Sequence, residues 1–178
     1  MNFNLKINDG EKVIELGGGA HPFFRPNVDV RICMDAEGKA TVDFAADFNN
    51  PLPIANDEWD VVFTRYAIEH ISWRNIRSFI LEVARIIKPG GRAIVITANT
   101  EAQIEWIQNH PDGWDGHGPF DSCSSIIFGD QDYPDNSHRC YMNLRFMADL
   151  LDKAGFRKII VQPFGDRLTD LIAEAWKS

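Results

Sequence analysis

The sequence predicts a single α/β domain organised around a mostly parallel sheet. Two observations carry this prediction. Short apolar runs rich in Val and Ile alternate with segments of helical periodicity along the 178 residues. The first run, residues 13–16, leads directly into three glycines at 17–19, and open α/β sheets bind nucleotide-like ligands at such loops. With 44% hydrophobic residues, the chain can bury one substantial core.

Four strands are expected in the first part of the chain. Residues 13–16 predict a short buried strand, residues 27–34 contain a second, and residues 41–44 supply a third. Residues 59–64 form an almost continuous apolar run, which is typical of a strand covered on both faces. Residues 47–53 are expected to form a loop because they are rich in Asn and Pro.

The connection after the glycines is expected to contain no full helix. Pro22 and Pro26 restrict the backbone and remove two amide donors that a helix needs. The links between the first three strands must therefore be loops or single turns. The second strand ends at an acid, either Asp29 or Asp35, since both follow strand-like residues.

The middle of the chain holds its clearest helix. Apolar residues recur at helical spacing over 76–87, and the stretch stops at Pro89 and Gly90, a strong helix end. Residues 93–97 then predict a buried strand, and 101–108 a short helix.

The last part of the chain begins with a change of character. Residues 109–140 are dominated by polar residues and turn formers, and a segment of this kind within one domain, here 1–178, is usually functional. We expect it to form a substrate-side insertion or lid. Residues 141–154 predict a helix, 156–161 a strand, and 168–176 a short amphipathic helix.

Composition excludes several classes of protein. The net charge is −8 and no block of Lys or Arg stands out, so no nucleic-acid partner is expected. Three widely spaced cysteines without a CxxC pair favour free thiols in a reducing, cytoplasmic compartment. The N-terminus has no apolar leader-like region, and no run approaches the ~20 apolar residues that span a bilayer, so no membrane insertion is expected. Oligomeric state is not legible from the sequence.

Six pieces of sequence occur in an order and spacing typical of one family. They are VIELGGG at 13–19, NVDV at 27–30, ADFNNPLP at 46–53, WDVVFTRYAIEHI at 59–71, ILEVARIIKPGGRAIVIT at 80–97 and LRFMADLLDKAGF at 144–156. Over residues 13–161 the chain thus resembles a class I S-adenosylmethionine-dependent methyltransferase, which implies a Rossmann-like sheet and S-adenosylmethionine as cofactor. FRPNVDVR, ISWRN and IFGDQDYP also resemble a small bacterial subgroup that lacks the helix after the glycine loop.

The resemblance assigns cofactor roles around the glycine loop. It places Glu15 either to order this loop or to accept a hydrogen bond from the cofactor's ammonium group. It implies that Gly17 and Gly19 let the methionine portion lie close to the backbone. Gly18 occupies a position where many relatives carry another small residue.

The resemblance also assigns cofactor roles to two acids that lie near the ends of strands. Asp29 matches the acid whose paired carboxylate oxygens hold both ribose hydroxyls, with Asp35 as the alternative. Asp47 matches the acid that accepts from the adenine amino group, unless it caps its own loop. Phe48 lies beside it as a candidate for contacts to the adenine.

The chain departs from the family pattern at two places. His21 stands where a third separated glycine is frequent, and it either covers the methionine end or is an exposed loop residue. Some relatives bind magnesium through two acids and a histidine. Here Glu69 and His70 are present, but Tyr66 stands in place of the first acid, so no metal is expected.

Methyl transfer to a weakly acidic hydroxyl needs a base. His138 is the candidate base because histidine titrates near neutrality and a loop that could close over the site precedes it, although a surface role is the plainer alternative. Tyr66 and His70, at the end of the fourth strand, and Asp130 and Asp132, in the insertion, are further candidates.

The acceptor is expected to be a small polar molecule, with a saccharide or cell-surface precursor as the example. A non-catalytic S-adenosylmethionine-binding or scaffold protein is the alternative, and a nicotinamide-dependent oxidoreductase is disfavoured because GGGAHP breaks the dinucleotide-binding pattern. The insertion region supplies aromatic residues for an acceptor pocket or, alternatively, for the core: Trp106, Trp114, Phe120, Phe128 and Tyr133.

Overall fold

A seven-stranded sheet in the order β3-β2-β1-β4-β5-β7-β6 forms the centre of the computed structural model, which describes residues 7–113 and 119–178. All neighbours from β3 to β5 pair in parallel, and β7 alone runs in the opposite direction. The α/β fold with a mostly parallel sheet is thereby confirmed. The strands are β1 (Val13–Leu16), β2 (Asn27–Asp29), β3 (Phe44–Ala45), β4 (Trp59–Arg65), β5 (Ile87–Ala98), β6 (Phe156–Phe164) and β7 (Asp170–Lys177).

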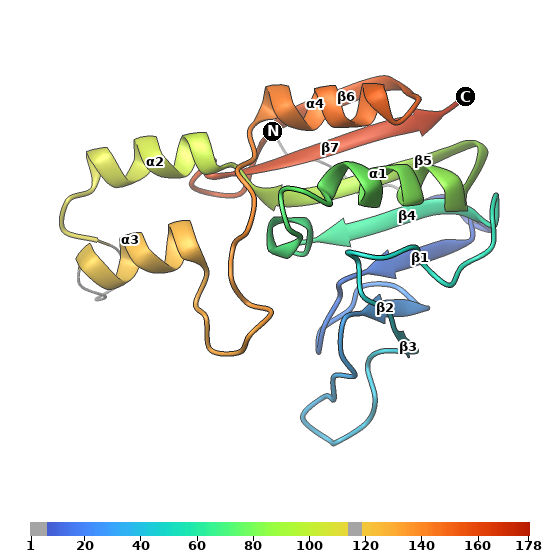
Figure 1. Ribbon diagram of the computed structural model, residues 1–178, viewed down its shortest axis with the longest axis horizontal. Coiled ribbons are helices and arrows are strands. Elements are labelled where there is room, and N and C mark those ends of the chain that lie inside the picture. Colours follow the sequence, from blue (N-terminus) through green and yellow to red (C-terminus); the bar gives the residue numbers. More distant parts are fainter. Residues whose placement is uncertain (1–6, 114–118) are drawn as a thin grey trace.

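The helices divide into two groups. In Figure 1, α1 and α4 lie on one face of the sheet, whereas α2 and α3 lie side by side beyond the end of β5. The asparagines that precede α2 and α4, Asn99 and Asn143, cap the first turns with their side chains. The bounds are η1 (Ile68–His70), α1 (Ile76–Ile86), α2 (Thr100–Asn109), α3 (Pro119–Phe128) and α4 (Leu144–Lys153).

The central strands are buried on both faces. Val62 and Val95 belong to the large core beneath α1 and α4, whereas Val61, Phe63 and Ile94 belong to a smaller core on the opposite face. Successive side chains of a strand point to opposite faces. The unbroken apolar runs of β4 and β5 therefore reflect two buried faces, as the sequence predicted.

An irregular segment covers the smaller core in place of a helix. No helix separates β1 from β2, as expected from the prolines. The rings of Phe23 and Phe24, in this link, pack edge-on against Phe63 at centroid distances of 6.0 and 5.2 Å. One carboxylate oxygen of Glu15 accepts hydrogen bonds from the amides of Phe23 and Phe24, at 2.6 and 2.7 Å. Glu15 thus fixes the segment that replaces the helix.

The predicted helix at 168–176 is wrong. These residues lie mainly in β7, which inserts between β5 and β6, and Leu171, Ile172 and Ala173 are buried in succession. The insertion also contains a helix, α3, that was not expected. The strand expected at 41–44 is only two residues long, while β5 begins six residues before its expected start at 93.

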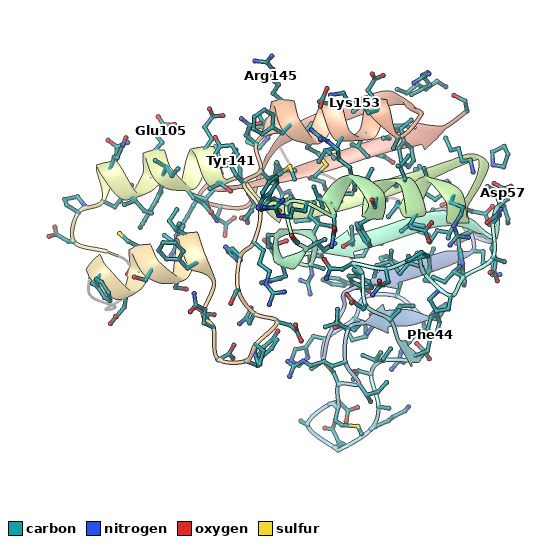
Figure 2. The ribbon with its side chains drawn as sticks, viewed as in Figure 1. Phe44, Asp57, Glu105, Tyr141, Arg145 and Lys153 are labelled. Atoms are coloured by element: carbon teal, nitrogen blue, oxygen red, sulfur yellow. The ribbon has the colours of Figure 1, made fainter. Side chains whose placement is uncertain are left out.

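Charged side chains project from the outer faces of α2 and α4. Glu105 on α2 and Arg145 and Lys153 on α4 point away from the sheet (Figure 2). Within the sheet, the buried guanidinium of Arg92 on β5 forms ion pairs with Glu11 and Glu174. In the described residues, no helix has the length and apolar character needed to cross a membrane.

Candidate functional site

A cavity of about 530 Å³ lies at the carboxyl ends of the parallel strands. This first cavity brings together most of the residues that the sequence singled out, from the ends of β1, β2 and β4 and the loop after β3. Its lining includes Gly17, Gly19, Asp29, Asp47, Phe48, Tyr66 and His70. Ligands of open α/β sheets bind at this edge of the sheet.

The glycines after β1 have different local reasons for lacking a side chain. Gly17 has a φ of +85°, and a Cβ there would lie 2.2 Å from that of Ala67. A Cβ on Gly18 would meet its neighbours at 2.7–2.9 Å, and Gly18 does not line the cavity. Gly19 has a φ of +54°, and a Cβ there would lie 4.0 Å from Oδ2 of Asp29, with no nearer neighbour among the described residues. Gly19 is therefore the glycine that leaves the most room beside the backbone.

Asp29 lies on the first cavity and Asp35 does not. Asp29 ends β2, and its carboxylate accepts from the amide of Gly19 at 2.9 Å and from that of Val30 at 2.7 Å. Asp35 instead accepts from the amide of Lys39 in an exposed turn. Asp29 therefore lies where a cavity ligand could reach it and Asp35 does not, while the role of Asp29 in binding the ribose stays a prediction.

Asp47 and Phe48, in the loop after β3, also line the first cavity. The Asp47 carboxylate accepts from the side-chain amides of Asn49 and Asn50, so it also organises its own loop. Phe48 is 4% exposed and its ring packs on Phe79 at a centroid distance of 5.2 Å. Phe48 is therefore held rigidly beside the cavity.

Glu15 and His21 lie outside the cavity lining. Glu15 is fully buried, and burial raises the pKa of its carboxyl. Its contacts to Phe23 and Phe24 agree with the loop-ordering role rather than with direct access to a ligand. His21 is an exposed loop residue whose carbonyl accepts from Arg65.

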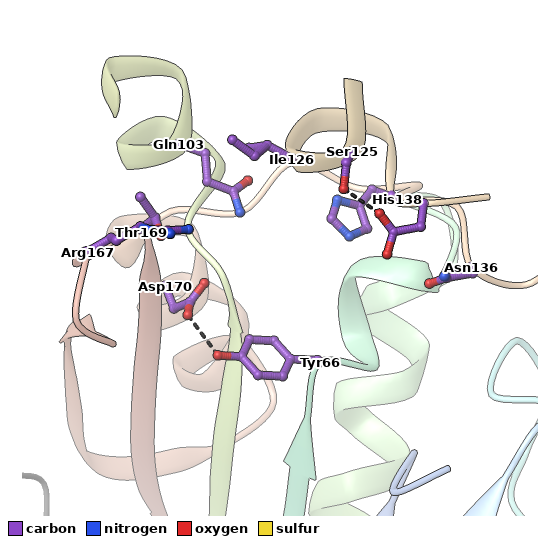
Figure 3. Close-up of a pocket in the computed structure, with 11 residues that line it drawn as sticks. Tyr66, Gln103, Ser125, Ile126, Asn136, His138, Arg167, Thr169 and Asp170 are labelled. Carbon is purple, nitrogen blue, oxygen red and sulfur yellow. Dashed lines mark hydrogen bonds between the residues drawn. The ribbon is translucent and has the colours of Figure 1, made fainter. Parts of the chain in front are cut away.

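A second cavity, of about 400 Å³, adjoins the first at Tyr66. Figure 3 draws the residues that line this second cavity. Tyr66 lines both cavities. Most of the second lining carries hydrogen-bonding groups, and Ile126 is its one large apolar side chain. The remaining lining residues are Gln103, Ser125, Gly129, Asp130, Asn136, His138, Arg167, Thr169 and Asp170.

Tyr66 is held between the two cavities by Asp170. Its hydroxyl donates to the Asp170 carboxylate at 2.7 Å, as the dashed line in Figure 3 marks. Burial, together with this hydrogen bond, raises the pKa of Tyr66, and burial raises the pKa of Asp170. Tyr66 therefore stays protonated and is better suited to position a ligand than to act as a base. No local sequence signal points to Asp170, which lies 104 residues away at the start of β7.

Two histidines from distant parts of the chain come together at this boundary. His70 lines the first cavity and His138 lines the second, with ring centroids 5.2 Å apart. Nδ1 of His70 lies 3.2 Å from the carbonyl oxygen of Ser137. Burial lowers the pKa of both imidazoles, so both favour the neutral form.

Glu69 lies close to the two histidines, and one side-chain ligand atom of each of the three residues lies within 4.8 Å of the others. It is 4% exposed, and its Oε2 accepts from the Thr97 hydroxyl at 2.9 Å. Burial raises the pKa of this carboxyl to about 7. Because Glu69 follows β4 and Thr97 lies on the paired β5, this bond ties the loop after β4 to the sheet.

The insertion contributes to the second cavity mainly through α3 and the loop after it. The hydroxyl of Ser125 donates to Asp130, and both residues line the cavity, whereas Asp132 does not. Among the described residues, none of the aromatic side chains predicted for the acceptor pocket lines this cavity. Tyr133 lines the first cavity, and Phe120 and Phe128 are 80% and 57% exposed. Trp106 stacks on His110 at 4.1 Å, and Trp114 lies outside the described residues.

Comparison with known proteins identifies the family. Residues 1–161 match the family described as "Methyltransferase domain". The chain is 29% identical over 100 residues to an uncharacterized methyltransferase of Synechocystis sp., and 44% identical over 45 residues to the uncharacterized protein YafE of Escherichia coli. These alignments cover 49% and 25% of this chain. They span only 47% and 21% of the two curated relatives.

The fold has close counterparts among solved structures. One is an S-adenosylmethionine-dependent methyltransferase of Thermotoga maritima, described as a possible histamine N-methyltransferase. The TM-score is 0.64 at 17% identity, and the match covers 94% of this chain and 83% of that one. Since the family match spans most of the sequence, the chain belongs to the class I S-adenosylmethionine-dependent methyltransferases, whose cofactor is S-adenosylmethionine.

Proposed function

We propose that this protein transfers a methyl group from S-adenosylmethionine in the first cavity to a small polar acceptor in the second. One observation carries the proposal: Tyr66 lines both cavities, so the two sites meet at a single side chain. Methyl transfer from a sulfonium is an in-line displacement, for which the protein chiefly supplies positioning. Two adjoining cavities provide that arrangement.

The residues of the first cavity suit the proposed cofactor. Gly19 lines the cavity without a side chain, which suits the methionine portion, and Asp29 offers carboxylate oxygens for the ribose hydroxyls. Asp47 and the fixed ring of Phe48 supply an acceptor and an apolar wall for the adenine. Because no helix follows Gly17 and Gly19, the loop lacks the dipole that favours a phosphate, which fits a cofactor without phosphate better than a dinucleotide.

The second cavity supports a hydroxyl-bearing or other small polar acceptor, such as a saccharide precursor. Gln103, Asn136 and Thr169 offer neutral hydrogen-bonding groups, and Asp130 offers acceptor oxygens. His138 is the proposed proton acceptor because its side chain lies on this cavity, while His70 and Tyr66 are proposed to position the reacting groups. All three cysteines are free thiols, which supports action in the cytoplasm.

Calorimetric titration with S-adenosylhomocysteine and, separately, NAD tests this assignment. We expect saturable binding of S-adenosylhomocysteine at one site per chain and no binding of NAD. Methyl transfer from labelled S-adenosylmethionine to extracts of small polar metabolites then tests catalysis, with His138→Ala as the inactive comparison. Binding without any labelled product, over a broad acceptor range, would favour the non-catalytic alternative. Binding of NAD alone would exclude the methyltransferase assignment.

A further inference from the structure

We propose that Glu69, His70 and His138 form a binding site for one transition-metal ion of the Zn²⁺ class. The three residues each offer a ligand atom, and these atoms all lie within 4.8 Å of one another. Two imidazoles and a carboxylate are a donor set that suits zinc and neighbouring transition metals rather than magnesium. The sequence predicts no metal because Tyr66 stands where some relatives have an acid. The structure adds a third ligand, His138, from the insertion.

The protein contacts around the two histidines favour metal binding. The carbonyl of Ser137 accepts from Nδ1 of His70, which leaves Nε2 with its lone pair. Burial lowers the pKa of His138, whereas the backbone carbonyls of Ile126 and Ile127, at the end of α3, raise it as hydrogen-bond acceptors. Metal-bound histidines typically donate their second ring N–H to such a carbonyl, which fixes the ring and its tautomer.

A hydrogen bond from Thr97 also fixes the position of the Glu69 carboxylate. Burial raises the pKa of this carboxyl, whereas the Thr97 hydroxyl and the backbone amides of Glu69 and Ala98 lower it as hydrogen-bond donors. About one of its roughly four lone-pair positions is therefore left for an ion. Glu69 and His70 are consecutive residues of η1, so their backbone positions are fixed together. The third ligand, His138, lies on the irregular chain between α3 and α4.

A small closure is needed to complete the site. Ligand atoms about 2.0–2.1 Å from a tetrahedral ion lie roughly 3.4 Å apart, and the three groups lie within 4.8 Å of one another, so they need to approach by at most about 1.4 Å. Three protein ligands leave at least one coordination position open, as in catalytic rather than structural zinc sites. That position lies near the boundary of the two cavities, because His70 lines one and His138 the other.

Metal binding is separate from the proposed methyl transfer and can be measured without cofactor or acceptor. An imidazole nitrogen that holds an ion cannot accept a proton. The metal-bound form and the form with His138 as proton acceptor are therefore alternative states, and added Zn²⁺ is expected to inhibit methyl transfer.

The test uses the untagged chain of 178 residues, freed of metal with a chelator. Calorimetric titration with Zn²⁺ should give one ion per chain, and Co²⁺ should produce visible absorption bands of an ordered coordination sphere. His138→Ala and, independently, His70→Ala should each weaken Zn²⁺ binding at least tenfold. His110→Ala is the matched control, since that ring stacks on Trp106 away from the cluster, and it should bind like the wild type.

Unfolding midpoints without metal show whether each variant keeps its fold. Equal Zn²⁺ affinity for the wild type and a folded His138→Ala or His70→Ala variant overturns the proposal. An absence of visible absorption bands after Co²⁺ is added overturns the proposal as well. Ions bound at scattered surface groups would lack the ordered coordination sphere that gives such bands. A failure of either kind leaves the cofactor proposal intact, since S-adenosylhomocysteine binding is measured separately.

Discussion

The Tyr66 hydroxyl donates a 2.7 Å hydrogen bond to the carboxylate of Asp170, and this bond joins the end of β4 to the start of β7. Tyr66 follows the parallel half of the sheet and Asp170 begins its antiparallel strand. The bond therefore links the cofactor side of the molecule to the proposed acceptor side.

Removal of this bond is expected to cost stability. Tyr66→Phe leaves the half-buried Asp170 carboxylate without its donor, which should lower the free energy of unfolding by about 1 kcal/mol. Urea denaturation measures the change. Tyr141→Phe is the control, because the structure records only a ring contact for Tyr141, with Phe146, among the described residues. Equal stability of the two variants would show that the bond contributes nothing.

Asp29 is expected to dominate recognition of the ribose. Asp29→Ala removes the carboxylate on the first cavity and should weaken S-adenosylhomocysteine binding at least tenfold by calorimetry. Asp35→Ala removes an acid of the same type from an exposed turn and should leave the affinity unchanged. The reverse outcome, with only the Asp35 variant impaired, would transfer the role to Asp35.

Gly17 is expected to be intolerant of a side chain for two reasons. Its φ of +85° strains any L-residue, and a Cβ would lie 2.2 Å from that of Ala67. Gly17→Ala should therefore destabilise the fold by about 3 kcal/mol or more. Gly10 has a similar φ of +88°, but a Cβ there would have no atom within 4 Å, so Gly10→Ala should cost only about 1 kcal/mol. Thermal unfolding of both variants separates the backbone strain, which both share, from the steric overlap with Ala67, which only Gly17→Ala has. An equal loss of stability in the two variants would contradict the steric overlap.

The ion pair of Glu11 with Arg92 predicts an acid-sensitive contribution to stability. The hydrogen-bonded Arg92 guanidinium lowers the pKa of Glu11 from 4.5 to about 2. The folded state therefore holds its proton less tightly than the unfolded state does, so the stabilisation is complete above pH 4.5 and is lost as the pH falls towards 2. Glu11→Gln should lower stability at pH 7 by about 2 kcal/mol, because it removes a charged hydrogen-bond partner from the buried Arg92 guanidinium. Its difference from the wild type should shrink below pH 4.5; a constant difference would refute the pairing.

The sequence predicted those parts of the molecule that depend on local pattern. Short apolar runs located the parallel strands, and Pro22 and Pro26 predicted the missing helix. The acids that follow the parallel strands lie close together because the carboxyl ends of these strands meet at one edge of the sheet. By contrast, β7 gains its stability from pairing with β5 and β6, which local periodicity does not report.

Part of the site was not predictable for the same reason. His138 meets His70 only because the chain after α3 returns across the end of η1, where the amide of Arg139 donates to the carbonyl of Glu69. Neither residue has a neighbour in sequence that signals this contact. Likewise, Asp170 reaches Tyr66 only through the placement of β7.

A crystal structure with S-adenosylhomocysteine tests the central claim most directly. The account predicts the ribose hydroxyls on Asp29, the adenine beside Phe48, and the sulfur directed towards Tyr66 and the second cavity. A ligand bound outside the first cavity would contradict it, as would a sulfur atom turned away from the cavity that contains His138.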